Sequence, residues 1–78
     1  MNIEHLIHMA NQIGSYFAAE PDPADARAGI ADHIARFWEK RMRQRLYAGL
    51  DSGEASALAP LVSEALAEHR ERLLGRAA

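Results

Sequence analysis

The chain has 78 residues, which limits it to one domain over residues 1–78 with a small hydrophobic core. It contains no cysteine, which excludes disulfides, iron–sulfur ligation and cysteine-based zinc sites, and its formal net charge of −2 argues against binding driven by nucleic-acid phosphates. No apolar run approaches the roughly 20 residues of a membrane span, and the first residues lack a secretion signal, so we expect a cytoplasmic protein with no membrane contact.

The first predicted helix covers residues 3–19, where hydrophobic residues recur at helical spacing. Asn2 precedes it as a candidate N-cap. Within the apolar stripe, Ala10, Gly14 and Ala18 are four residues apart, and small side chains at this spacing let another backbone approach closely. Two larger residues stand at the margin of the stripe, where a side chain is either an exposed apolar group or, more commonly, part of the core edge, namely Met9 and Tyr16.

The second predicted helix runs over residues 23–48, with Asp22 as its N-cap and Pro23 at its first position. Gly49 is placed to end it, while Gly29 lies on its polar side. At 1.5 Å per residue this helix would be roughly 39 Å long. Because it is much longer than its neighbours, its C-terminal part would project beyond them and expose apolar and arginine side chains together.

The third predicted helix covers residues 60–74, opened by Pro60 and closed by Gly75. No segment alternates with the period of a strand. The sequence therefore predicts an all-α fold, a small bundle of three main amphipathic helices with a long central helix. If the end of that central helix is uncovered, the isolated chain is expected to self-associate.

The central segment, residues 30–42, holds the only tryptophan and opens the densest basic run. Arg41 and Arg45 project from its apolar half, where each could simply lay its stem along the core edge with the guanidinium in water. Alternatively the pair binds carboxylates of a partner protein, since buried Trp and Arg are common interface hot spots. We predict a partner interface with a centre of Trp38, Arg41, Met42 and Arg45 and a rim of Arg36 and Arg43.

Residues for catalysis, cofactor binding or metal binding are not recognisable in the sequence. His5 and His8 are three residues apart on the polar face of the first helix, but a zinc site needs more ligands than two. His33 is expected on the solvated side of the second helix. A second function class, a small helical nucleic-acid-binding module or another interaction module, would use the basic run Lys40, Arg41, Arg43 and Arg45.

Several short motifs occur in a fixed order and spacing, namely Met9-Ala10-Asn11-Gln12-Ile13, Phe17, His33, Phe37-Trp38, Arg41-Met42 and Leu58-Ala59-Pro60-Leu61-Val62. Together they resemble the delta subunit of NAD-dependent, molybdenum-containing formate dehydrogenase. One position departs from the family, which often has proline two residues after the tryptophan, where this chain has Lys40. Lysine there is expected to let the helix continue.

The resemblance implies an accessory, non-catalytic subunit of a cytoplasmic enzyme complex that oxidises formate and reduces NAD. The molybdenum cofactor, the iron–sulfur clusters, FMN and NAD would belong to partner subunits. This chain would bind the catalytic (alpha) subunit and stabilise or help to assemble the complex.

Overall fold

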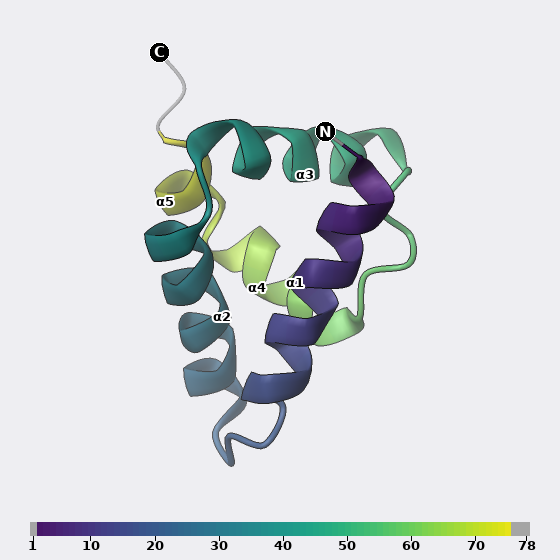
Figure 1. Ribbon diagram of the computed structural model, residues 1–78. Coiled ribbons are helices and arrows are strands. Elements are labelled where there is room, and N and C mark those ends of the chain that lie inside the picture. The colour runs from purple at the N-terminus through teal and green to yellow at the C-terminus, as the bar shows by residue number, and fades with distance from the viewer. Residues whose placement is uncertain (1, 76–78) are drawn as a thin grey trace.

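The computed structural model describes residues 2–75, which form five helices around one core. Helices α1 and α2 lie side by side and run in opposite directions, and α3 crosses their ends (Figure 1). Helix α4 packs against α1 and α2, and α5 against α2, α3 and α4. The bounds are α1 (Ile3–Phe17), α2 (Pro23–Phe37), α3 (Lys40–Ser52), α4 (Pro60–Glu68) and α5 (Arg70–Leu74). The all-α prediction is confirmed.

Polar caps at two helix starts match the prediction. The Asn2 side chain accepts a hydrogen bond from the backbone N–H of Glu4 at 2.8 Å, and the Asp22 carboxylate accepts one from Ala24 at 2.9 Å. Both satisfy amide groups that have no acceptor within the helix. Pro60 opens α4 as expected, and α5 ends at Gly75, whose φ is +84°.

The prediction of one long central helix is wrong, because the helix is interrupted between Phe37 and Lys40. Trp38 has φ −97° and ψ 132°, and Glu39 has φ −64° and ψ 155°, both extended conformations. A straight continuation would carry Leu46 and Tyr47 away from the other helices. The break instead lays α3 across α1 and α2, where Leu46 and Tyr47 are buried. The C-terminal part of the predicted helix therefore does not project from the bundle. The prediction that the isolated chain self-associates rested on that projection and no longer has a structural basis.

Two further helix ends differ from the prediction. Gly49 does not end a helix but lies buried within α3, where an added Cβ would stand 2.7 Å from Ile3 Cδ1. The helix continues to Ser52 and ends at Gly53, whose φ of +86° favours glycine. The third predicted helix is interrupted at His69, which ends α4 and precedes α5.

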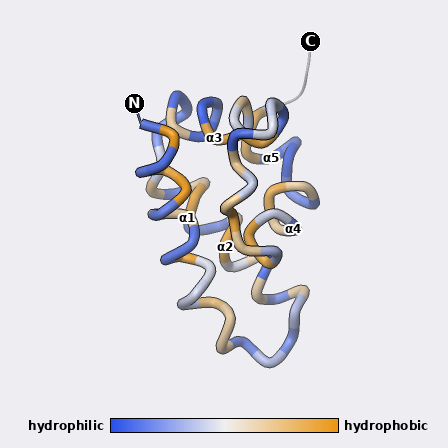
Figure 2. The backbone as a smooth tube through the Cα atoms, turned by 90° about the vertical axis from the view of Figure 1, so that its right-hand side faces the viewer, coloured by the Kyte–Doolittle hydropathy of each residue, from blue (hydrophilic) through white to orange (hydrophobic). Residues whose placement is uncertain are grey.

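The core lies where all five helices meet, and in α1 the hydropathy alternates between its inner and outer sides (Figure 2). Gly14 lies on the inner side, and a Cβ added there would be 2.5 Å from Val62 Cγ2 of α4. The predicted small-residue seam thus packs closely at this position. The largest fully buried side chains are Tyr47, Leu6, Ile30, Ile34, Leu46, Leu66, Leu73 and Val62.

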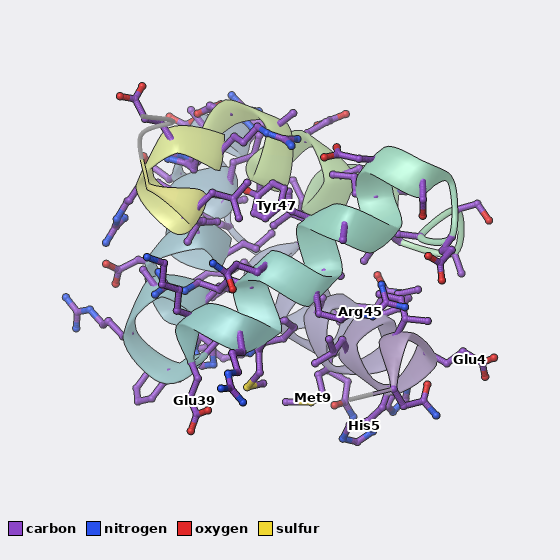
Figure 3. The ribbon with its side chains drawn as sticks, turned by 90° about the horizontal axis from the view of Figure 1, so that it is seen from above. Glu4, His5, Met9, Glu39, Arg45 and Tyr47 are labelled. Atoms are coloured by element: carbon purple, nitrogen blue, oxygen red, sulfur yellow. The ribbon has the colours of Figure 1, made fainter. Side chains whose placement is uncertain are left out.

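Tyr47 links α3 to the last two helices. Its hydroxyl donates a 2.6 Å hydrogen bond to the backbone carbonyl of Leu66, and the Arg70 guanidinium lies 5.0 Å from the ring centroid. Figure 3 shows the ring pointing inward from α3. Arg70 also donates two hydrogen bonds to Asp51, which lowers the pKa of that carboxyl. Burial raises the pKa of Tyr47 to about 12.

Asn11 fixes the connection between α3 and α4. Its amide nitrogen donates to the carbonyl of Ala57 at 3.0 Å, and its amide oxygen accepts from the N–H of Ala59 at 2.8 Å. One side chain therefore satisfies two backbone groups just before Pro60 begins α4. The pairing joins two of the short motifs in the sequence, the one around Asn11 and the one around Ala59.

Candidate partner-binding surface

The structure separates the predicted interface residues. Trp38 is only 5% exposed and belongs to the core, so it offers almost no surface in this conformation. Met42 is half-buried against the same core. Arg41 is exposed at the start of α3. Arg36 is exposed at the end of α2, and its Nε lies 3.1 Å from a carboxylate oxygen of Asp32. If this set binds a partner, Trp38 holds the neighbouring residues in place from within the core and does not itself contact the partner.

Arg45 and Arg43 are both half-buried on α3, in different surroundings. The Nη2 of Arg45 pairs with a carboxylate oxygen of Glu54 at 3.2 Å. The Ser52 hydroxyl donates to the other oxygen of Glu54, and these two contacts, Ser52 first, lower the pKa of that carboxyl. Arg43 has its Nε buried with no hydrogen-bond partner among the described residues. Arg45 thus does more than extend its guanidinium into water, because its ion pair with Glu54 links α3 to the segment that follows it.

A second surface, on the face shared by α1 and α2, carries the most exposed large hydrophobic side chains. Tyr16 is 77% exposed and Phe37 is 70% exposed. A pocket of about 400 Å³ on this surface is lined by Ile13, Tyr16, Phe17 and His33, and Phe37 adjoins it through its ring contact with His33. The rings of Tyr16 and Phe17 meet edge to face, with centroids 5.0 Å apart. We call this surface the aromatic groove and define it by Ile13, Tyr16, Phe17, His33 and Phe37.

Helical spacing and one glycine build the aromatic groove. On α2, Gly29, His33 and Phe37 are four residues apart and so share a face. A Cβ at Gly29 would be 2.4 Å from Cε1 of Phe17, so only glycine lets the Phe17 ring settle between the helices without moving. The His33 ring then stands 4.8 Å from that of Phe37, tilted by 45°.

The two ends of the aromatic groove carry opposite charge. At the turn between α1 and α2, Glu20, Asp22 and Asp25 are all exposed. At the other end, where α2 meets α3, the exposed cations Lys40 and Arg41 have no ion-pair partner within residues 2–75, and they outnumber the exposed carboxylate of Glu39 beside them.

Arg41 lies on the side of α3 turned toward α1. It stands four residues before Arg45 and eight before Gly49, and positions at this spacing share a helix face. Gly49 packs against Ile3 of α1, which fixes the direction of that face. Figure 3 shows Glu39, at the α2–α3 junction, on the same side of α3 as Met9 of α1.

Sequence reasoning missed the aromatic groove although its residues were visible. For Tyr16 the structure selects the less common alternative, an exposed apolar side chain, over the core edge. His33 was expected in solvent but is half-buried beside Phe37. Gly29 was expected on the polar side of its helix but lies half-buried against Phe17. The available signal was the register of Gly29, His33 and Phe37, together with an aromatic pair at the end of the first helix.

A comparison with protein families matches residues 5–66 of the 78 to the family described as NADH-dependant formate dehydrogenase delta subunit FdsD. Neither the curated proteins nor the solved structures contain a match. Within residues 2–75, no helix combines the length and the apolar character needed to cross a bilayer, and no three His, Asp or Glu side chains come together as a metal site would require.

Proposed function

We propose that this chain, which belongs to the NADH-dependent formate dehydrogenase delta subunit family, is an accessory subunit that binds and stabilises the catalytic complex or helps to assemble it. The family match over residues 5–66 is the observation that carries the proposal. In this proposal the chain works in the cytoplasm and has no catalytic residue of its own. The molybdenum cofactor, iron–sulfur clusters, FMN and NAD are held by the partner subunits, the catalytic (alpha) subunit being the expected contact.

The surface chemistry supports a binding role. Contiguous exposed apolar patches often mark interaction sites, and here exposed Tyr16 lines a pocket that exposed Phe37 adjoins through His33. The unpaired cations Lys40 and Arg41 lie at the edge of the same face. An aromatic centre with a charged rim is the usual organisation of a protein–protein interface.

Co-purification tests the proposal directly. A tagged copy of the chain is expressed in the native host and isolated under mild conditions, and the bound proteins are identified by mass spectrometry. We expect the formate dehydrogenase subunits in fixed proportion to the chain. The other subunits, expressed with and without this chain, should give less intact complex and less formate-dependent NAD reduction when it is missing. An equal yield of active complex in both cases would refute an assembly or stability role.

The isolated chain provides the test of the non-catalytic role. Purified alone, it should neither reduce NAD with formate nor contain molybdenum, iron or flavin. Stoichiometric metal or a flavin spectrum in the purified chain would refute that part of the proposal. Binding to mixed DNA or RNA that weakens with salt would instead favour a nucleic-acid-binding module.

A further inference from the structure

The shape of the aromatic groove limits what can occupy it. Two helices, α1 and α2, form its walls, and the pocket between them lies at Ile13, Phe17 and His33. A convex apolar ridge fits such a surface, and the ridge of one α-helix is the commonest form. A second copy of this chain would bring the same hollow face against it and leave space between the two. The groove therefore favours a single helix over self-pairing.

The charges at its two ends give the occupant a direction. Exposed Glu20 and Asp25 at one end attract positive charge, and exposed Lys40 and Arg41 at the other attract negative charge. A helix carries partial positive charge at its N-terminus and partial negative charge at its C-terminus. The best-matched occupant thus begins near the α1–α2 turn and ends, with acidic side chains, near the α2–α3 corner.

We propose that the aromatic groove binds one amphipathic helix of a neighbouring subunit of the complex, with the acidic C-terminal end of that helix at Lys40 and Arg41. The inference rests on the proposed function, because it takes the occupant from the enzyme complex. A helix that spans the 15 residues of α2 is about 22 Å long and makes four turns. Its apolar side contacts the rings of Tyr16 and Phe37, which enclose its flanks.

Site-specific photo-crosslinking in the assembled complex tests the position and the direction. A benzophenone side chain replaces Tyr16, Phe37 or Arg41 in turn, and replaces Ala67, exposed on α4, as the control. We expect the three groove positions to crosslink to one helical segment of another subunit, with the Arg41 crosslink nearest its C-terminal end. Crosslinks to another copy of this chain, to scattered segments, or from Ala67 alone would overturn the proposal.

Two sets of variants test the energetic basis. Tyr16→Ala with Phe37→Ala should weaken binding to the complex by about 30-fold, the value for losing one interface hot spot of roughly 2 kcal/mol. Lys40→Glu with Arg41→Glu should weaken it by about tenfold at low salt and less at high salt. Tyr47→Phe is the matched core control and should leave the affinity unchanged, since Tyr47 is buried.

The outcomes separate this inference from the proposed function. Wild-type chain that fails to co-purify with the other subunits would refute the proposed function itself. Wild-type and aromatic double variant that co-purify equally would refute only the groove as the docking site. A concentration-dependent dimer of the isolated wild-type chain, abolished in the double variant, would assign the groove to a second copy instead.

Discussion

Replacing Lys40 with proline should stabilise the chain. Lys40 is the first residue of α3, where proline is favoured because its fixed φ suits a helix start and the N–H there has no acceptor within the helix. The preceding Glu39 already has φ −64° and ψ 155°, the conformation that a following proline imposes. Proline then restricts mainly the unfolded chain, and we expect a gain of about 0.4–1 kcal/mol in the free energy of unfolding.

A continuous helix over residues 23–48 predicts the opposite sign. Proline at position 40 would then remove the hydrogen bond to the Arg36 carbonyl and clash with it, at a cost of about 3 kcal/mol. A domain of this size has roughly 3–5 kcal/mol of net stability, so such a variant would be largely unfolded. The two structures therefore differ by about 4 kcal/mol in what they predict for one substitution.

Urea unfolding and thermal unfolding, both followed by far-ultraviolet circular dichroism, measure the effect. Lys40→Ala controls for the lost charge, and Gln44→Pro, inside α3, shows what proline costs in a helix interior. We expect Lys40→Pro to raise the melting temperature by about 2–8 °C and Gln44→Pro to abolish cooperative unfolding. If Lys40→Pro behaves like Gln44→Pro, the break at Trp38–Glu39 and the reasoning built on it are incorrect.

Four further predictions follow from contacts in the core. Asn11→Ala loses two hydrogen bonds and should cost about 2 kcal/mol, measured by urea unfolding, whereas an unchanged midpoint would mean that the loop is held elsewhere. Gly14→Ala gains about 1 kcal/mol of helix propensity, but its contact with Val62 should cost more, about 1–3 kcal/mol, so calorimetry should show a lower melting temperature. Trp38→Ala should lose about 3–5 kcal/mol and the helical signal with it; retained helicity would put Trp38 outside the core. The pKa of Tyr47 rises on folding from 10.0 to about 12, so its neutral form stabilises the fold below pH 10, and this contribution should vanish as the pH rises through 12 in the wild type but not in Tyr47→Phe.

Three of the five helix starts, those of α1, α2 and α4, could be predicted from the sequence, but the direction of the chain after Phe37 could not. Asn2, Asp22 and Pro60 act locally, and their capping chemistry is the same in any fold. The break at Trp38–Glu39 has no proline or glycine to mark it. It exists because burying Leu46 and Tyr47 against the other helices outweighs continuing a regular helix, which is a property of the whole bundle.

The candidate site was predicted less well than the fold, because exposure depends on which residues pack behind a side chain. Trp38 and Phe37 are adjacent and both apolar, yet one is 5% exposed and the other 70%. The end of α2 lies between them, so their side chains leave the backbone in different directions. Arg41 was correctly expected at the surface, whereas the pairing of Arg45 with Glu54 depends on where Gly53 turns the chain.

The Asn11 contacts have a consequence for how the chain folds. They join residues 46 and 48 positions apart in the sequence, so they cannot form until α1 has met the segment that leads into α4. Closing a loop of this length costs chain entropy, and our hypothesis is that these hydrogen bonds form after the rate-limiting step. Asn11→Ala should then speed unfolding and leave the refolding rate almost unchanged. The segment from Gly53 to Ala59 would be the last to become ordered and the first to be cut by a protease.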